Sequence, residues 1–231
     1  MKTTVFPKEM DIVPSLICMD LCNLERDVHR LEAMGCSILH VDILDGRYSP
    51  CMPIGLDTIR QLRERTQMLF DVHIMSVANE FFVSEALSMG VERVCFQLES
   101  QATPGPLLHR IRSAGCQTGI ALAPSTPVSA LDYLIEDCNF VLLMQIDPGY
   151  ASFAGVSKEP YMLRKIEDLR ALMDKRNPRA TITVDGRVDF DSMPSLRQAG
   201  VQHFVSGTKG IFSPGDTWEN NWQKLLTIVG S

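Results

Sequence analysis

The sequence predicts an α/β fold, a single (β/α)8 TIM barrel that spans residues 1–231. Short apolar runs alternate with amphipathic helical stretches from one end of the chain to the other, which is the pattern of repeated βαβ units. The apolar runs have no polar face, as expected of parallel strands covered by helices. Eight such units in 231 residues favour closure into a barrel, and no Gly/Ser-rich or Pro-rich linker divides the sequence.

The expected elements follow one another in strict alternation. The expected strands are Ile12–Cys18, Ile38–Ile43, Leu69–Ile74, Arg93–Leu98, Thr118–Leu122, Phe140–Ile146, Thr181–Val184 and His203–Ser206. The expected helices are Leu24–Met34, Gly55–Arg65, Ala78–Met89, Pro106–Ala114, Val128–Ile135, Pro160–Lys175, Asp191–Ala199 and Thr217–Val229. Several of these helices are followed by a glycine, which accepts the left-handed conformation that ends a helix. The longest stretch without periodicity, residues 147–159, is expected to be a functional loop.

Charge and hydropathy exclude two classes of partner. The net charge of −6 and the pI near 5.4 argue against a nucleic-acid-binding protein, which would present a basic face to phosphates. No apolar run approaches the roughly 18 residues of a membrane span, and the first residues lack the apolar centre of a signal peptide. We therefore expect a cytoplasmic protein with no nucleic-acid or membrane partner.

The seven cysteines are odd in number, scattered, and contain no C-x-x-C pair. Most fall within apolar strand-like or helix-like runs. Their distribution favours small buried hydrophobic residues in a reducing compartment over a disulfide framework.

Histidines and carboxylates lie at the ends of three predicted strands. His40 and Asp42 are two residues apart on one strand and therefore face the same side, whereas His73 and Asp185 end two other strands. Active sites of barrels lie at the C-terminal ends of the strands, so these side chains are expected to meet there. Taken singly, each residue is as well explained by a hydrogen-bonded core histidine or a helix cap. Together they favour one divalent metal ion (Zn, Fe, Mn or Co), because imidazole and carboxylate ligands suit all four.

Three glycine-containing loops point to a phosphate site. They are residues 147–155, 185–187 and 206–210, which follow the sixth, seventh and eighth predicted strands. Barrels commonly hold phosphate through backbone N–H groups after strands seven and eight. Arg187 and Lys209 either add positive charge to this site or are solvated surface residues.

Seven motifs occur in order along nearly the whole chain: Val13-Pro14-Ser15-Leu16, His40-Val41-Asp42 through Asp45-Gly46, Asp71-Val72-His73-Ile74-Met75, Ala123-Pro124-Ser125-Thr126-Pro127, Asp147-Pro148-Gly149-Tyr150, Val184-Asp185-Gly186, and Gly207-Thr208 with Ile211-Phe212. In these motifs the chain resembles the ribulose-phosphate 3-epimerases, including the related allulose-6-phosphate 3-epimerases.

The resemblance implies a function and a set of site residues. It implies an isomerase that interconverts D-ribulose 5-phosphate and D-xylulose 5-phosphate by two-aspartate proton transfer through an enediolate, which a metal stabilises. His40, Asp42, His73 and Asp185 would be the metal ligands, with Asp42 provisionally the proton acceptor and Asp185 the donor. Two methionines would shield the enediolate from water, although plain core packing explains them equally well. The implied substrate contacts are Ser15, His73, Met75, Met144, Gly149, Tyr150, Ala151, Ser152, Gly186, Arg187, Gly207 and Thr208.

The sequence departs from the usual family pattern mainly where a substrate would be held. Leu44 stands in place of a Met, Gln97 in place of a frequent His, and Ala123 in place of a frequent Asn. Residues 150–155 replace a Phe-Gly-Gly-Gln segment, and Arg187 replaces the second glycine of an Asp-Gly-Gly motif. These changes leave the proposed metal and acid/base set intact.

Three alternatives stay open at the level of the sequence. The substrate could be another ketose phosphate such as D-allulose 6-phosphate. A sugar-phosphate decarboxylase on a similar barrel is disfavoured, because the Asp-x-Lys-x-x-Asp array of such enzymes does not occur in the sequence. A non-catalytic barrel that binds a sugar phosphate is disfavoured by retention of both aspartates. Association into a homo-oligomer, common among barrels of this size, is a further expectation.

Overall fold

The computed structural model describes residues 11–151, 153 and 155–230. Its strands are β1 (Asp11–Pro14), β2 (Ile38–Leu44), β3 (Leu69–Met75), β4 (Arg93–Gln97), β5 (Gln117–Leu122), β6 (Phe140–Met144), β7 (Thr181–Asp185) and β8 (His203–Ser206). Its α-helices are α1 (Leu24–Ala33), α2 (Leu56–Arg63), α3 (Asn79–Ser88), α4 (Pro104–Ser113), α5 (Met162–Arg176), α6 (Met193–Gln198) and α7 (Trp218–Gly230).

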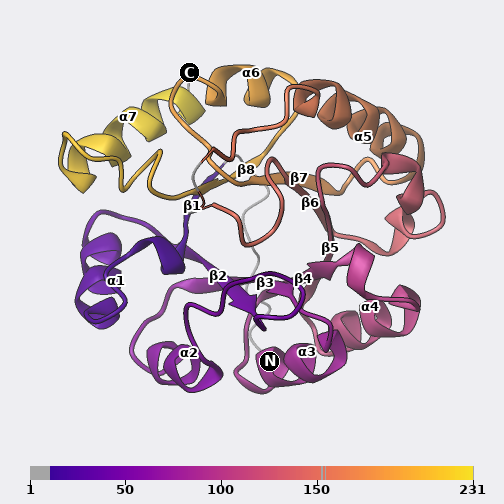
Figure 1. The fold of residues 1–231 in the computed structure, drawn as a ribbon, viewed down its shortest axis with the longest axis horizontal. Helices are drawn as coiled ribbons and strands as arrows, with labels where there is room; N and C mark the ends of the chain where they lie inside the picture. The colour runs from indigo at the N-terminus through magenta and orange to yellow at the C-terminus, as the bar shows by residue number, and fades with distance from the viewer. Residues whose placement is uncertain (1–10, 152, 154, 231) are drawn as a thin grey trace.

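The strands form one parallel sheet in the order β1-β8-β7-β6-β5-β4-β3-β2. A single parallel bridge between Ser15 and His40 joins the two ends of this order and closes the sheet. Figure 1 looks along the resulting barrel, with the helices arranged around a central ring of strands. The predicted TIM barrel is therefore confirmed.

The apolar side chains form two layers, one outside and one inside the ring of strands. The outer layer packs against the helices, each of which turns one apolar face inward. In α1, for example, Leu24, Val28 and Leu31 recur at helical spacing and are all buried. The inside of the barrel holds a separate apolar cluster, Cys95, Ala121, Phe140, Leu142 and Met144. Because both faces are covered, β2, β4, β6 and β8 are buried along their whole length.

Most predicted elements agree with the structure to within two residues at each end, and two differ by more. The helix expected at Val128–Ile135 is wrong: this segment forms two short 3₁₀ helices, Val128–Leu131 and Ile135–Asp137. Its backbone bonds join residues three apart, and its Ser and Asp side chains are weak helix formers. The first strand ends at Pro14, not at Cys18, because Leu16–Cys18 turns into a further 3₁₀ helix.

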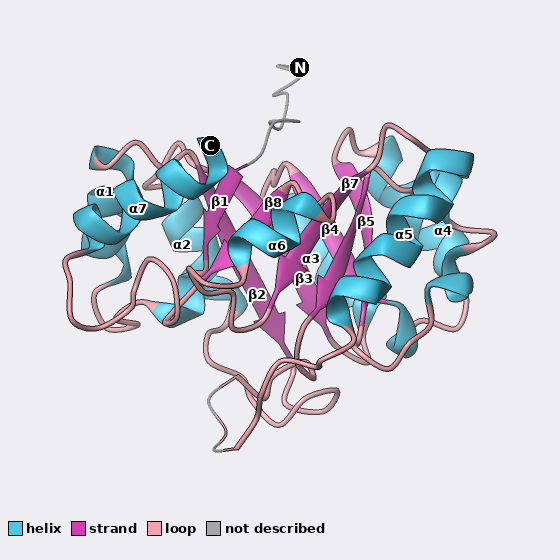
Figure 2. Ribbon diagram, turned by 90° about the horizontal axis from the view of Figure 1, so that it is seen from above, coloured by secondary structure: helices cyan, strands magenta, loops and turns pink. Residues whose placement is uncertain are grey.

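All strands run toward the same end of the barrel, so their C-terminal ends share one rim. Figure 2 shows the strand arrows pointing to this rim, where the longest loops project. The loop between β6 and α5, which the sequence predicted to be functional, begins here. Any site built from strand ends must therefore lie on this side of the barrel.

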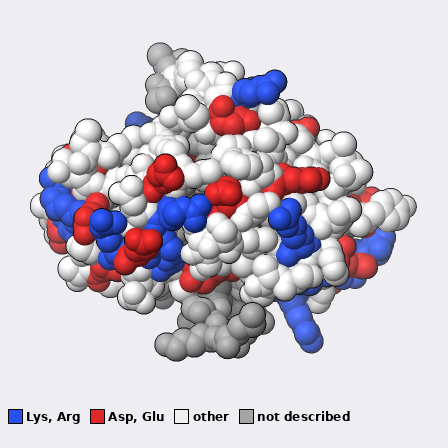
Figure 3. All heavy atoms as spheres, turned by 90° about the horizontal axis from the view of Figure 1, so that it is seen from below, with Lys and Arg blue, Asp and Glu red and all other residues white. Residues whose placement is uncertain are grey.

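The surface in Figure 3 carries interspersed positive and negative side chains over the helices of the first half of the barrel. Arg60 pairs with Glu85 at 2.8 Å, and Arg65 pairs with Glu25 at 3.3 Å. On this face no wide basic area is visible among the described residues. Among the residues that the structure describes, no helix has both the length and the apolar character that crossing a membrane requires.

Candidate active site

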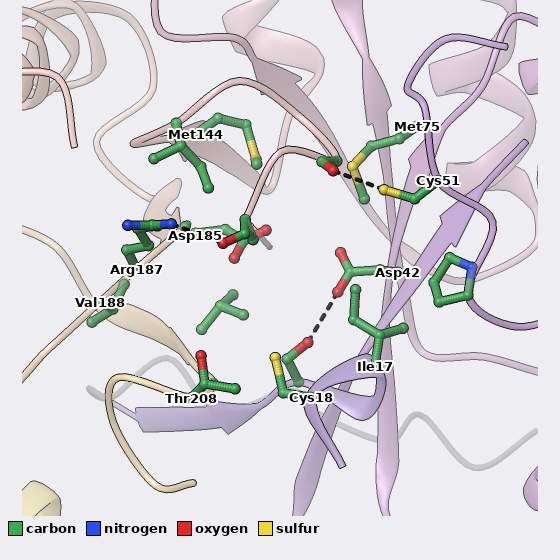
Figure 4. A pocket seen from close by; sticks show the side chains of 18 of the residues that line it. Ile17, Cys18, Asp42, Cys51, Met75, Met144, Asp185, Arg187, Val188 and Thr208 are labelled. Carbon is green, nitrogen blue, oxygen red and sulfur yellow. Dashed lines mark hydrogen bonds between the residues drawn. The ribbon is translucent and has the colours of Figure 1, made fainter. Parts of the chain in front are cut away.

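A pocket of about 440 Å³ opens at the C-terminal ends of the strands (Figure 4). Its walls come from the segments that follow β1, β2, β6, β7 and β8. Asp42 and Asp185 enter it from opposite sides, and Met75 and Met144 contribute apolar surface. Its size falls within the range of roughly 300–1,000 Å³ that is usual for small-molecule sites.

The four predicted metal ligands meet at the floor of this pocket. Each of His40, Asp42, His73 and Asp185 offers one ligand atom, and these atoms lie within 4.8 Å of one another. Asp42 Oδ1 is 3.2 Å from His40 Nε2 and 3.3 Å from His73 Nδ1. Asp185 Oδ2 lies 3.8 Å and 3.7 Å from the same two nitrogens. Both imidazoles are fully buried, whereas the two carboxylates reach the pocket.

Strand register explains why these side chains converge. Asp42 on β2 is paired with His73 on β3, and alternate residues on each strand face the interior of the barrel. Asp185 is the last residue of β7, on the other side of the pocket. Three short segments far apart in the sequence thereby place four ligand atoms around one point.

Three buried atoms that face this point have no hydrogen-bond partner among the described residues: His40 Nε2, Asp42 Oδ1 and His73 Nδ1. Unpartnered polar atoms in a protein interior cost free energy, so their concentration at one place is informative. A divalent ion would satisfy all three. The residues present therefore fit a metal site that uses imidazole and carboxylate ligands.

In each histidine, the ring nitrogen that faces away from the cluster has a polar partner. His40 Nδ1 lies 3.0 Å from Asp71 Oδ2, so it donates to this carboxylate and leaves Nε2 free to bind a metal. His73 Nε2 lies 3.0 Å from the Gln97 amide nitrogen. When His73 Nδ1 binds a metal, Nε2 carries the proton, and a half-turn of the Gln97 amide presents its carbonyl oxygen as the acceptor.

Charge and burial act against each other at these groups. Burial lowers the pKa of His40, but Asp42 and Asp71 outweigh it, so this pKa lies well above its ordinary value. Burial lowers the pKa of His73, but the nearby carboxylates of Asp185 and Asp42 outweigh it, so this pKa is also raised. Burial raises the pKa of Asp42, and the nearby His40 more than reverses this, so Asp42 is ionised. At Asp71, burial is opposed by Arg93 and His40, and the net pKa lies below the ordinary range.

Metal binding is therefore expected to release protons. Both histidine pKa values are raised in the metal-free protein, and a ligand nitrogen must be unprotonated, so affinity should increase as the pH rises. We expect about one to two protons to be released per ion bound. Calorimetric titration of the metal-free protein with Zn²⁺, in buffers of different ionisation enthalpy, measures this number. An affinity that does not change between about pH 6 and pH 8 would contradict the expectation.

Ser15 was expected to contact the substrate, and it lines the pocket. Its Oγ donates to Asp42 Oδ2 at 3.0 Å. The two oxygens of Asp42 are thus divided: Oδ1 faces the histidines and Oδ2 accepts from Ser15. This contact fixes the orientation of the carboxylate.

Glycines allow two loops to approach the pocket closely. A Cβ on Gly207 would lie 2.7 Å from Cys18 Sγ, and one on Gly186 would lie 2.7 Å from Ile146 Cγ1. Gly186 also has φ +100°, a conformation that side chains rarely adopt. The Gly186 carbonyl accepts from Gln145 Nε2 at 3.0 Å, which directs the next N–H to the opposite side of the peptide. The predicted contacts Gly149, Ala151, Gly186, Gly207 and Thr208 all line the pocket, as does Lys209.

Arg187 has an unusual backbone and makes a contact that the sequence did not predict. Its φ of +53° makes it the non-glycine residue with a left-handed backbone among the described residues. Its Nη2 donates to the carbonyls of Ala151 at 3.0 Å and Phe153 at 3.3 Å. The guanidinium therefore ties the loop after β7 to the loop after β6, at the edge of the pocket that Arg187 lines.

Two further predicted contacts, His73 and Tyr150, are outside the pocket lining, and a third lies outside the described residues. Tyr150 is not among the residues that line the pocket; it is 39% exposed and packs its ring 5.0 Å from that of Phe153. Ser152 lies outside the described residues. The bulk that distinguishes this loop thus contributes an aromatic pair on its outer side.

Cysteine nucleophiles are excluded by their surroundings. All seven cysteines are free, and Cys18 and Cys51 line the pocket. Burial raises the pKa of the Cys18 thiol to about 11, and Cys51 Sγ donates to the Gly149 carbonyl at 2.7 Å. Neither is a thiolate at neutral pH, so these residues pack and hydrogen-bond.

Sequence comparison identifies the family. A model described as the ribulose-phosphate 3 epimerase family matches residues 11–212. The chain belongs to this family. It is 32% identical over 201 residues to the ribulose-phosphate 3-epimerase of Treponema pallidum (strain Nichols), which covers 87% of this chain and 91% of that protein. It is 30% identical to the enzyme of the same name from Escherichia coli (strain K12), with 90% and 92% covered.

As a member of the ribulose-phosphate 3 epimerase family, the chain is an isomerase, and the family implies a sugar-phosphate substrate. Solved structures outside this similarity share the fold alone. Mycobacterium tuberculosis tryptophan synthase matches with a TM-score of 0.64 at 12% identity, over 96% of this chain and 91% of that one. Thiamine phosphate pyrophosphorylase from Pyrococcus furiosus matches with a TM-score of 0.60 at 16% identity, over 96% of both chains.

The close approach at Gly207 gives a prediction that separates binding from chemistry. Gly207→Ala places a methyl group against Cys18 Sγ and should displace the loop after β8, at a strain of about 1–3 kcal/mol. We expect KM to rise and kcat to change less, because the loop belongs to the expected phosphate site and carries neither aspartate. The double variant Gly207→Ala/Cys18→Ala removes the obstructing sulfur and should restore KM. Failure of this restoration would show that the steric contact is not the cause.

Proposed function

We propose that this epimerase inverts carbon 3 of a phosphorylated ketose, with D-ribulose 5-phosphate as the favoured substrate and D-xylulose 5-phosphate as the product. The observation that carries the proposal is the placement of Asp42 and Asp185 on opposite sides of one pocket, beside the same cluster of imidazoles. Inversion requires a proton to leave one face of a carbon and another to arrive on the opposite face. Two carboxyl groups that flank a substrate provide both.

The proton transfers follow from the placement of the two aspartates on opposite sides of the pocket. Asp42, whose low pKa keeps it ionised, takes the proton from carbon 3, and the electron pair of that C–H bond moves into the neighbouring carbonyl to form an enediolate. Asp185, on the other face and the most exposed of the four cluster residues at 16%, then gives a proton to carbon 3. In the reverse direction the two roles exchange. A divalent ion held by the cluster supplies Lewis-acid stabilisation of the negative charge when bound.

The remaining pocket residues support this chemistry. Met75 and Met144 are nearly fully buried and present apolar surface beside the carboxylates, where they exclude water from the enediolate. Gly149, Gly186 and Gly207 bring three loops against the pocket, and their backbone N–H groups are proposed to hold the phosphate. Arg187 and Lys209 add positive charge on the same side, in a chain whose net charge is −6.

Ketose phosphates of five and of six carbons are the two candidate substrates, so the test includes both. The purified protein is first analysed for bound Zn, Fe, Mn and Co. Turnover is then measured with D-ribulose 5-phosphate and D-allulose 6-phosphate, together with incorporation of deuterium from heavy water at carbon 3. We expect epimerisation and deuterium exchange with the five-carbon ketose. Preference for the six-carbon ketose would favour the alternative substrate, and tight binding of both without exchange would overturn the catalytic proposal.

A further inference from the structure

Arg93 is a charged side chain buried inside the barrel, beneath the candidate metal cluster. It lies on β4, in register with Asp71 on β3, and is completely shielded from solvent. Burial of a charged group is costly unless it is paired and hydrogen-bonded. The partners of the Arg93 guanidinium therefore indicate its role.

The guanidinium has a partner on each side. Its Nη1 lies 3.4 Å from Asp71 Oδ2, and its Nη2 donates to Thr183 Oγ1 at 2.8 Å. Its centre lies 3.5 Å from the centroid of the Phe140 ring, which is a close cation–π contact. Arg93 thus connects β3, β6 and β7 through the interior of the barrel.

The interior has space for this arrangement because of one glycine. A Cβ on Gly119 would lie 2.4 Å from the Phe140 ring, so only glycine at this position of β5 leaves room for the ring. The Phe140 ring in turn supports the guanidinium. The neighbouring strands β4, β5 and β6 are thus matched in residue size: Gly119 leaves room for the Phe140 ring, and this ring packs against Arg93.

Both anchors of Arg93 lead to the metal cluster. Asp71 Oδ2, which pairs with Arg93, also accepts from His40 Nδ1 at 3.0 Å. Thr183 stands two residues before Asp185 on β7, so both side chains face the same side of that strand. Arg93 therefore contacts His40 through one intermediate residue, Asp71. It is also hydrogen-bonded to β7, the strand that carries Asp185.

Arg93 brings a positive charge to the carboxylate that holds His40. Asp71 is fully buried, and a carboxylate in a protein interior is costly to ionise without a cationic partner. The Arg93 guanidinium, 3.4 Å from Asp71 Oδ2, is such a partner. Loss of Arg93 would therefore disturb the contact by which Asp71 holds His40.

We propose that Arg93 is the positioning residue of the metal site: it fixes Asp71, which orients His40, and it supplies the positive charge that stabilises the buried carboxylate of Asp71. Arg93 does not contact the pocket and acts only through its neighbours. The inference rests on the proposed metal site but not on the identity of the ketose.

The test measures metal affinity without substrate. Arg93→Gln removes the charge and keeps a side chain that can donate hydrogen bonds. We expect the affinity for Co²⁺, measured by competition with a chromophoric chelator, to fall roughly 10- to 100-fold. The visible absorption of bound Co²⁺ should also change, because His40 is less well oriented. Arg93→Lys keeps the charge and should recover most of the affinity. Arg112→Gln, which breaks the exposed ion pair with Asp137, is the matched control and should leave it unchanged.

A double-variant comparison tests the route through Asp71. In an Asp71→Asn background, Arg93→Gln should cause little additional loss, since the residue through which Arg93 acts is already altered. Thr183→Val, which keeps every charge and removes one anchor of Arg93, should cause a smaller loss and serves as the test if Arg93→Gln does not fold. Unchanged Co²⁺ affinity and spectrum in the folded variants, or fully additive losses, would overturn the inference. A protein whose metal affinity depends on Arg93 but that turns over no ketose phosphate would overturn only the proposed function.

Discussion

Asp185→Asn is expected to lower net epimerisation by roughly 10²- to 10⁴-fold, because the variant keeps an oxygen ligand for the metal but has no carboxyl group to donate the second proton. Asp42 remains in place opposite it, hydrogen-bonded to Ser15. The remaining carboxylate should still remove a proton from one face of carbon 3 and return one to the same face. In heavy water, the variant should therefore incorporate deuterium into one epimer without inverting it.

The complementary variant makes this result decisive. Asp42→Asn should show the same loss of epimerisation but exchange deuterium only with the other epimer, because its surviving carboxylate is on the opposite face. Proton NMR at carbon 3 of each separate epimer measures the exchange. Asp191→Asn changes an exposed aspartate and is the matched control, expected to be fully active. Inversion at a near-normal rate in either pocket variant would contradict the two-aspartate assignment.

His73→Ala is expected to have the second large effect, by removing a metal ligand. Loss of a residue that merely supports a ligand costs roughly 10- to 100-fold in metal affinity, so loss of the ligand itself should cost more. The variant should purify without stoichiometric metal and show little turnover. The wild-type protein should behave in the same way after treatment with a chelator and regain activity when a divalent ion is added.

The control for this prediction is His109→Ala, which removes an exposed histidine on α4. It should retain full metal content and activity. Metal analysis by mass spectrometry and turnover measured on the same samples decide the outcome. Full activity of the chelator-treated wild-type protein would contradict a metal-dependent mechanism.

The barrel and its four cluster residues could be predicted from the sequence because both depend on strand periodicity. Once His40 and Asp42 are placed two apart on a strand, and His73 and Asp185 at two other strand ends, the geometry of a parallel barrel brings them to one rim. Asp71 carries the same signal, two residues before His73 on the inward face of β3, but its contact with His40 depends on the register of β2 against β3, which the sequence does not show. The helix expected at Val128–Ile135 was wrong because its apolar spacing suits both an α-helix and two 3₁₀ helices.

Contacts between side chains on distant strands could not be predicted from the local sequence pattern. In the sequence, Arg93 is a charged residue at the start of an apolar run. Nothing near it in the sequence indicates that Phe140 and Thr183 will be its neighbours. Arg187 could be predicted only as a charge at the phosphate site or a solvated surface residue, and nothing near it in the sequence indicates that its guanidinium donates to two carbonyls of the loop after β6. Such partners are set by how the barrel closes.

The closure of the barrel also bears on its integrity. Seven of the junctions between neighbouring strands contain two or more paired residues, whereas β1 and β2 meet through the single bridge at Ser15 and His40. This narrow seam lies at the active site, since His40 belongs to the metal cluster and Ser15 holds Asp42. A bound ion would fasten β2 to β3 and β7 beside the weakest joint. We expect amide hydrogen exchange in β1 and the adjoining part of β2 to slow markedly on metal loading, while β4 to β6 change little. Loss of the ion would then open the β1–β2 junction before the whole protein unfolds. Equal slowing of exchange in all the strands would contradict this expectation.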